Sequence, residues 1–282
     1  CTIACAMSFA AFRKAGHQNW PYGMLVAALV WMAKTGLSEP LIDGNSTAAR
    51  WGSQVFGVSP SAEGGNGLKA YIEKFYTNQF FPYLLEHNII NVVDLGDTFD
   101  RRKYVNFHTL NEVKRFYFDV LAQHHIRLHS IVGNHSTYYR NTNSVNSSDL
   151  LYGHYDNIET YPEVSTICID GTVIDLIPWI NSENYEKTMY FIKHSKAQVA
   201  FGHLEVAGFA MYKGYNAEDG ISKDIFKGYE VVCSGHYHHK SSKDNIHYLG
   251  APYEITWNDY DAVSYTHLRA HETDSYLVCR LL

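Results

Sequence analysis

The chain has 282 residues, 46% hydrophobic and 18% charged, so it is long enough to bury a substantial core in one large domain or two small ones. Its net charge of −6 excludes the overall basic field that many nucleic-acid-binding proteins carry. Its five cysteines are odd in number and lack CxxC spacing, which argues against a disulfide framework or zinc knuckle and fits a reducing cytosol. No apolar run approaches the ~20 residues that cross a bilayer, so no membrane span is predicted.

The N-terminal part, residues 1–66, has no clear strand pattern and is hard to place, and one interpretation is that it is foreign or out of frame. Within it, residues 24–33 (MLVAALVWMA) resemble the core of a signal peptide. No small-residue cleavage site clearly follows, so a buried helix is the preferred prediction. The chain begins at Cys1 rather than Met, and we expect it to be a fragment.

Beyond this segment, predicted helices and strands alternate. Residues 68–87 place apolar side chains at helical spacing, with Pro82 ending or kinking the helix. Residues 89–95 predict a buried strand, 107–124 an amphipathic helix and 126–132 a second strand. A strand, helix and strand in this order predict a βαβ unit, hence a parallel sheet with a right-handed crossover.

The second half of the chain continues this α/β pattern. A hairpin is predicted at residues 168–177, turning at Asp170 and Gly171, and a helix at 183–194. Further short strands are predicted at residues 197–201, 230–233 and 246–249.

Four predicted strands end in a glycine that is followed at once by side chains able to bind a metal. These ends read Gly96-Asp97, Gly133-Asn134-His135, Gly202-His203 and Gly235-His236-Tyr237-His238. Because ligands of open α/β sheets bind at the carboxyl ends of strands, we expect these ends to share a site. Imidazole, carboxylate and amide groups together suit Mn²⁺, Zn²⁺ or Fe²⁺.

The strand ends at Asp97 and at His236 and His238 predict more specific roles. The carboxylate of Asp97 can bridge two cations about 3.5–4 Å apart, although an aspartate after a strand also reads as the N-cap of a following helix. His236 and His238, two residues apart in a segment predicted to be extended, are expected to point the same way and to serve neighbouring metals.

The motif order Gly-Asp-x-x-Asp, Gly-Asn-His, Gly-His-x-Glu, Gly-His-x-His resembles that of the calcineurin-like metallophosphoesterases over residues 68–261. The stretches GDTFDRR, DLIPW, GHLEVAGF, SGHYHHK and YLGAPYEITW are similar to the phage branch of the SbcD-like recombination nucleases, which process DNA ends alongside an SMC-like ATPase. The resemblance implies an α/β fold, a calcineurin-like β-sandwich flanked by helices and incomplete at both ends. Its core would span residues 67–261, between the segment 1–66 and a tail at 262–282.

The resemblance also implies a role for each candidate residue. Asp97 would bridge two divalent cations, Mn²⁺ by preference and Zn²⁺, Fe²⁺ or Mg²⁺ as alternatives. One cation site would be completed by Asn134, His203 and His236, while His238 would belong to the other. His135 would contact the phosphate and protonate the departing alkoxide.

The two arginines after the first motif are less specific. Arg101 and Arg102 would contact the substrate backbone, with a solvated loop as the alternative reading. Asp100 is expected to cap or orient rather than to ligate.

The chain departs from the family pattern at three places. The first strand, which normally ends Asp-x-His and supplies two metal ligands, is not found; Asp43 is a partial substitute, and residues 52–58 match only the flanking pattern. Ser136 stands where Asp usually follows Asn-His, so His135 should be less readily protonated.

The third departure is the C-terminal tail, which from about residue 263 resembles the translation of a sequencing adapter. His267 and His271, four residues apart, imitate a helical metal pair, but the adapter reading is preferred. We expect neither terminal stretch to pack onto the central sheet.

Three functions follow as hypotheses. The first is a cytoplasmic DNA exo/endonuclease subunit that hydrolyses phosphodiesters with a two-metal-activated water, partnered by DNA and an SMC-like ATPase, with a homodimer as a further option. The second is a phosphatase on protein or nucleotide substrates. The third is a catalytically impaired fragment that only binds DNA or a partner.

Overall fold

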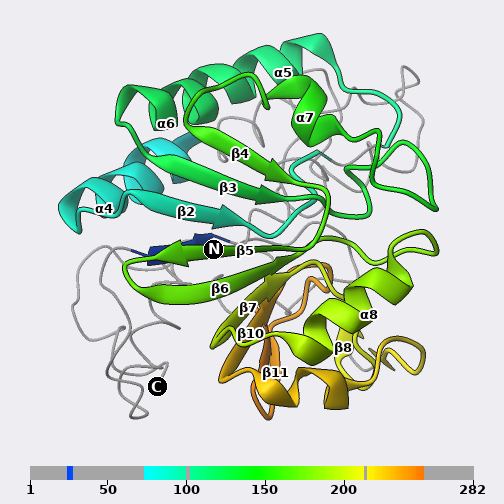
Figure 1. The fold of residues 1–282 in the computed structure, drawn as a ribbon. Helices are drawn as coiled ribbons and strands as arrows, with labels where there is room; N and C mark the ends of the chain where they lie inside the picture. Colours follow the sequence, from blue (N-terminus) through cyan, green and yellow to red (C-terminus); the bar gives the residue numbers. More distant parts are fainter. Residues whose placement is uncertain (1–23, 28–72, 100–101, 213–214, 251–282) are drawn as a thin grey trace.

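The computed structural model describes residues 24–27, 73–99, 102–212 and 215–250, and all structural statements below concern these residues. They form a mixed α/β fold in which two sheets face each other (Figure 1). Helices cover the outer side of the first sheet, and α8 (Tyr185–His194) lies against the second. None of the described helices is long and apolar enough to cross a membrane.

The first sheet contains four parallel strands. Their order in the sheet is β1 (Met24–Ala27), β2 (Asn91–Asp94), β3 (Arg127–Ile131) and β4 (Ile158–Tyr161). The chain passes from β2 to β3 through one continuous helical segment made of α5 (Phe107–Val113), the π-helical η2 (Lys114–Phe118) and α6 (Asp119–Gln123). The predicted βαβ unit is therefore confirmed.

Two helices of this half, α5 and α7 (Ser147–Leu151), begin at asparagine caps. The side chain of Asn106 accepts hydrogen bonds from the backbone N–H groups of His108 and Thr109 at the start of α5. Asn146 caps α7 in the same way.

The predicted helix around Pro82 is also present. It consists of the π-helical η1 (Tyr76–Phe80) and α4 (Phe81–Glu86), with Pro82 in the first turn of α4. Because proline lacks an N–H, Pro82 cannot donate a bond within this continuous helical segment, and the π-helical η1 directly before α4 interrupts the regular α-helical pattern there without ending the helix.

The strand β1 corrects the interpretation of the N-terminal run. Residues Met24–Ala27 form a strand that pairs in parallel with β2, matching Leu25 with Val92 and Val26 with Val93. The prediction of a helix at 24–33 is therefore wrong for these four residues, as is the expectation that the N-terminal stretch stays off the central sheet. The physical reason is that a short apolar run cannot be assigned to helix or strand by periodicity alone.

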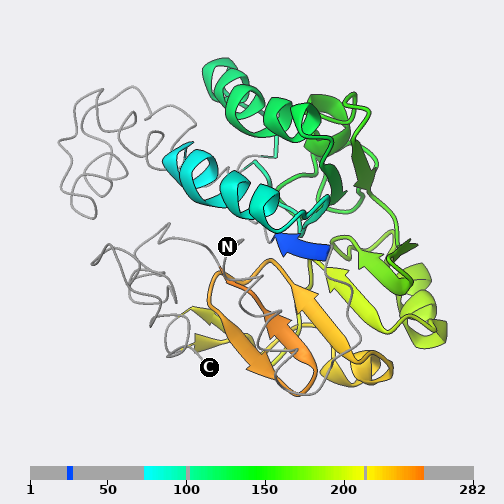
Figure 2. The same ribbon diagram turned by 90° about the vertical axis from the view of Figure 1, so that its left-hand side faces the viewer.

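Figure 2 shows β1, in blue, at the edge of the first sheet next to the second sheet. The remainder of residues 1–66, and all of the tail at 262–282, lie outside the described residues. The boundaries of the three predicted segments stay predictions.

The second sheet has six strands. They lie in the order β11 (Ser241–Lys243), β12 (Ile246–Tyr248), β10 (Val231–Ser234), β7 (Val199–Gly202), β6 (Thr172–Ile177), β5 (Ser165–Ile169). The strands β6, β7, β10 and β12 are parallel, and the outer strands on both sides are antiparallel to their neighbours. The helix α8 connects β6 to β7, and a short 3-10 helix, η3 (Lys223–Gly228), precedes β10.

The hairpin between β5 and β6 turns where it is predicted to turn. Asp170 and Gly171 both have positive φ angles, 48° and 80°, as a two-residue turn of the type that matches strand twist requires. A second, small hairpin that the sequence does not predict is formed by β8 (Ala210–Tyr212) and β9 (Tyr215–Asn216).

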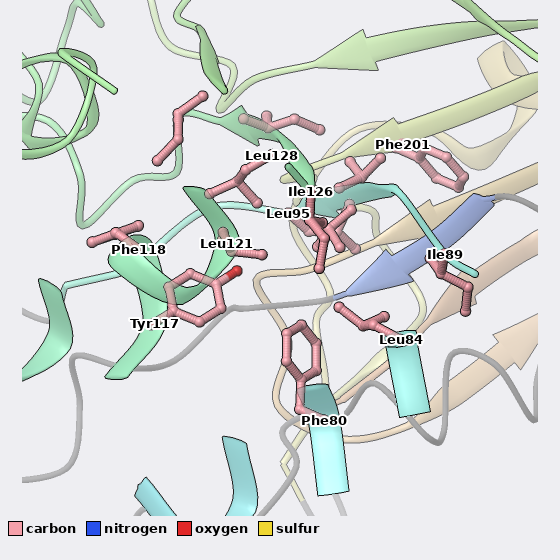
Figure 3. Packing of buried hydrophobic residues seen from close by; sticks show 14 of the residues in the cluster. Phe80, Leu84, Ile89, Leu95, Tyr117, Phe118, Leu121, Ile126, Leu128 and Phe201 are labelled. Carbon is pink, nitrogen blue, oxygen red and sulfur yellow. The ribbon is translucent and has the colours of Figure 1, made fainter. Parts of the chain in front are cut away.

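The main core lies between the two sheets and beneath the helices that cover the first. Figure 3 shows Phe80 and Leu84 from the first helical segment, Leu95 from the end of β2 and Phe201 from β7. All four side chains are at most 1% exposed, and burying each contributes about 1.5–3 kcal/mol. A second cluster packs the other face of the second sheet against α8 and η3. The two cores hold the sheets so that their strand ends meet.

Candidate metal centre

The carboxyl ends of four strands, two from each sheet, meet at one edge of the molecule. Backbone hydrogen bonds join them: Gly235 N donates to Gly202 O (3.0 Å), and Trp179 N donates to Val132 O (2.8 Å). The second bond links the end of β6 to the end of β3 and so connects the two sheets. The residues that follow β2, β3, β7 and β10 are thereby brought to one place.

Asp97, Asn134, His203 and His236, here called the four-residue cluster, come together there, with His203 in contact with each of the other three. His203 Nε2 lies 2.9 Å from Asn134 Oδ1 and 3.3 Å from Asp97 Oδ2. It lies 3.2 Å from His236 Nδ1, which is itself 3.3 Å from Asn134 Oδ1. Donor atoms that share one cation through bonds of about 2.1 Å stand about 3.0–3.4 Å apart, so these spacings fit a common ion.

His203 is held so that its metal-binding nitrogen faces the cluster. The ring is fully buried, and its Nδ1 lies 2.8 Å from the carbonyl oxygen of Leu95. A carbonyl only accepts, so Nδ1 carries the proton and Nε2 turns toward the oxygens of Asp97 and Asn134. His203 Nε2, Asp97 Oδ2 and Asn134 Oδ1 are all electron-rich, so their close approach requires a positive centre between them, either a proton or a divalent cation.

The donor set is a mixed one. Among the described residues, His, Cys, Asp and Glu side chains alone form no group of three placed to hold a metal. The four-residue cluster differs because the amide oxygen of Asn134 touches both imidazole rings and completes the set. Carboxylate, amide and imidazole donors together suit Mn²⁺, Zn²⁺ or Fe²⁺.

Two members of the cluster adopt an unusual backbone conformation. Asp97 has φ 61° and His236 has φ 77°, in a region that residues other than glycine rarely adopt and that tends to occur at functional sites. Gly96, with φ 97°, has no room for a side chain, since a Cβ would stand 2.8 Å from both Gly133 N and His203 Nδ1. The close approach of these loops therefore depends on glycine.

His135 is placed beside the cluster through its backbone. Its N–H donates to Asp97 Oδ1 at 2.6 Å, and the residue is half-buried. The same bond fixes the Asp97 carboxylate, leaving Oδ2 to face His203.

The loop after β10 is not extended as predicted. The left-handed φ of His236 turns the chain, and Tyr237 is buried, with its ring stacked on Tyr248 at 4.6 Å. His238 is half-buried two residues further along, and its place in a second cation site stays a prediction.

Several other predicted residues lie outside the described residues: Asp43, Asp100, Arg101, His267 and His271. Arg102, by contrast, is described and lies near the site. Its Nη1 donates to Thr137 Oγ1 (2.9 Å), and its guanidinium stands 5.1 Å from the centre of the Trp179 ring. Partial burial lowers the pKa of its guanidinium, although the nearby carboxylates of Asp97 and Glu205 act to raise it.

Sequence reasoning assigned no role to Glu205 and Trp179, although both stand in quoted motifs. Glu205 Oε1 accepts a hydrogen bond from Trp179 Nε1 (3.0 Å) and lies 3.5 Å from His236 Nε2. The signal was the Glu of the Gly-His-x-Glu motif, two residues after His203. Its carboxylate orients the His236 ring so that Nδ1 faces the cluster.

A buried polar network lies behind the loop that carries Asp97. Asp94, fully buried at the end of β2, accepts hydrogen bonds from Gly96 N (2.9 Å), Thr98 Oγ1 (2.6 Å) and Ser130 Oγ (3.1 Å). Tyr152 OH touches the same two hydroxyls. Burial raises the pKa of Asp94 to about 7, although these hydrogen bonds lower it.

Ser136→Ala is expected to change the free energy of unfolding by less than about 0.5 kcal/mol. Ser136 is 1% exposed, and its hydroxyl has no hydrogen-bond partner among the described residues, so the substitution removes a buried polar atom without breaking a bond. Urea unfolding of both proteins measures the difference. A loss above about 1 kcal/mol would reveal a partner for this hydroxyl.

Comparison with known proteins gives one extended sequence match. The chain is 38% identical over 181 residues to Exonuclease subunit 1 of Enterobacteria phage T4, an alignment that covers 64% of this chain and 53% of that protein. The chain thus spans about half the length of this curated relative. No family model matches the sequence. Among solved structures, GAP50, the anchor in the inner membrane complex of Plasmodium, aligns with a TM-score of 0.38 and 15% identity over 63% of this chain and 67% of that one.

Proposed function

We propose that this chain is a metal-dependent phosphoesterase with a calcineurin-like core, acting as the DNA exo/endonuclease subunit of an SbcD-like nuclease. The observation that carries the proposal is the four-residue cluster, in which donor atoms from four strand ends stand 2.9–3.3 Å apart around His203 Nε2. The similarity to a phage exonuclease subunit supports the nuclease role. The word "subunit" supports a partner protein, for which we propose an SMC-like ATPase.

The residues of the site would divide the work as follows. Asp97, Asn134, His203 and His236 would hold a divalent cation, Mn²⁺ by preference. Such a cation would supply positive charge to phosphate oxygens and lower the pKa of water. His135, whose backbone N–H donates to Asp97 Oδ1, would contact the phosphate through its imidazole and donate a proton to the leaving oxygen. Arg102 supplies a fixed positive charge next to the cluster.

A second candidate function rests on the missing first motif. The sequence contains no Asp-x-His, and the residues that follow β1, Ala28 and Leu29, carry no metal-binding side chain. A chain that holds one cation firmly and the second weakly or not at all would bind DNA without cleaving it. This binding-only function competes with the nuclease function.

Incubating the purified chain with Mn²⁺ and a labelled single-stranded oligonucleotide separates these functions. Strand cleavage that disappears in His135→Ala and in the presence of a chelator supports the nuclease. Turnover of phosphate monoesters without diesters would instead support a phosphatase on protein or nucleotide substrates. Oligonucleotide binding without any turnover supports the binding-only function.

Glu205→Gln is expected to weaken Mn²⁺ binding about 10-fold. The amide keeps an oxygen for Trp179 Nε1 but loses the negative charge 3.5 Å from His236 Nε2, so the ring is oriented less firmly. Titration calorimetry with Mn²⁺ measures the effect, and Glu186→Gln, on the exposed first turn of α8, is the matched control. Equal affinities in all three proteins would remove Glu205 from the site.

A further inference from the structure

The loops that follow β2 and β3 carry a group of aromatic and basic side chains next to the four-residue cluster. This group, here called the rim patch, consists of Arg102, Lys103, Tyr138, Tyr139 and Arg140. The first two residues follow Asp97 in one loop, and the other three follow Asn134 in the next. The hydrogen bond from Arg102 Nη1 to Thr137 Oγ1 ties the two loops together.

The two tyrosines form an exposed pair. Their ring centres are 4.8 Å apart at an interplanar angle of 79°, and the residues are 41% and 50% exposed. Lys103 Nζ lies 5.3 Å from the centre of the Tyr138 ring. Other tyrosines of the chain are as exposed, but this pair stands together beside the candidate site, where two adjoining aromatic rings offer a ligand an apolar contact surface.

The charge of the rim patch differs from that of the whole chain. It holds three cationic side chains, whereas the chain carries a net charge of −6. Among the described residues, none of these three forms an ion pair with a carboxylate, so their charge is available to an anion. Arg102 is held by its hydrogen bond to Thr137 and lies over the Trp179 ring.

We propose that the rim patch is a stacking subsite for unpaired DNA bases, which guides a single strand into the four-residue cluster. Exposed aromatic rings interleaved with basic side chains bind single strands by stacking bases on the rings and pairing cations with phosphates. The bases inside a duplex are already stacked on one another and cannot stack on the tyrosines. The subsite therefore distinguishes unpaired from paired DNA. This inference rests on the proposed function, since it takes DNA as the ligand.

The test measures binding without turnover. Fluorescence anisotropy of a labelled oligothymidylate and of a blunt-ended hairpin duplex is recorded with EDTA for the full chain and its variants. We expect Tyr138→Ala/Tyr139→Ala to weaken binding of the single strand 10- to 100-fold and binding of the duplex less than 3-fold. Phenylalanine at both positions keeps the rings and should bind within 3-fold of the unchanged protein. Tyr190→Ala, an exposed tyrosine on α8, is the matched control.

The outcomes separate this inference from the proposed function. Equal losses for single strand and duplex, or no loss at all, would overturn the stacking subsite, even if the chain cleaves DNA with Mn²⁺. A selective loss in a chain that never cleaves DNA would uphold the subsite and count against the nuclease function. Loss of affinity in the phenylalanine variant as well would assign the effect to the hydroxyl groups, as expected of a protein partner's surface, and would also overturn stacking.

Discussion

His203→Ala is expected to weaken divalent-cation binding by at least about 100-fold and to lower metal-dependent phosphodiester hydrolysis by a similar factor. His203 Nε2 lies 2.9–3.3 Å from atoms of Asp97, Asn134 and His236. Without the ring, the remaining donors lose their common neighbour. The Leu95 carbonyl also loses its partner.

Metal content distinguishes loss of the site from loss of the fold. Elemental analysis after dialysis against Mn²⁺, together with titration calorimetry, should show one fewer bound ion per chain in His203→Ala than in the unchanged protein. His129→Ala is the control, because His129 is also a buried histidine, on β3, bonded to Tyr161 OH (2.9 Å). This variant should lose stability but keep its metal. Full occupancy in His203→Ala would refute the metal centre.

The strand ends were predictable because their signal is local. Short apolar runs that stop at Gly96, Gly133, Gly202 and Gly235 indicate buried strands followed by tight turns, and the structure has a strand before each of them. The convergence of four such ends follows from a general rule about parallel sheets. The approach of Asp97, Asn134 and His236 to His203 was therefore within reach of the sequence, and the distances show it, whereas their metal-binding roles and the place of His238 stay predictions.

The features that sequence reasoning missed depend on distant partners. The strand β1 forms because β2, more than sixty residues later in the chain, offers a free edge, and nothing within residues 24–33 carries that information. The turn at His236 is set by Gly235 pairing with Gly202 and by Tyr237 packing on Tyr248. A period-two pattern of histidines cannot reveal such constraints.

The same dependence on distant partners explains why the sequence did not reveal the roles of Glu205 and Trp179. Their sequence positions place Glu205 in the Gly-His-x-Glu motif and Trp179 after a predicted strand, but do not show that the two side chains meet. The bond between them exists because the end of β6 is joined to the end of β3 and the end of β7 lies beside it. Residues that orient a ligand are recognised from three-dimensional contacts, whereas ligands themselves often stand in a motif.

Asp94→Asn is expected to abolish a loss of stability that the unchanged protein shows as pH rises from about 4 to about 7. Burial raises the pKa of Asp94 to about 7 from its ordinary 3.8. Across this range the unfolded chain releases the proton while the folded chain keeps it, so the free energy of unfolding falls with rising pH. A shift of this size corresponds to about 4 kcal/mol, fully expressed above pH 7. Asparagine does not ionise, so the variant lacks this dependence.

The difference in the free energy of unfolding between the variant and the unchanged protein isolates the titration of Asp94, because the contributions of the other titrating groups cancel in that difference. Urea unfolding at pH 4, 5.5, 7 and 8 should show the free energy of Asp94→Asn rising relative to the unchanged protein, whatever constant cost the altered contacts to Thr98 and Ser130 impose. Asp244→Asn is the control of opposite sign, because Lys223 lowers the pKa of this exposed carboxylate. Relative to the unchanged protein, the free energy of unfolding of Asp244→Asn should fall slightly as pH rises, because the variant lacks the stabilisation that the ionised carboxylate provides. A flat difference for Asp94→Asn would mean that Asp94 is ionised throughout, its charge sustained by Gly96 N and the two hydroxyls, and that the loop carrying Asp97 is anchored by a carboxylate rather than by a neutral acid.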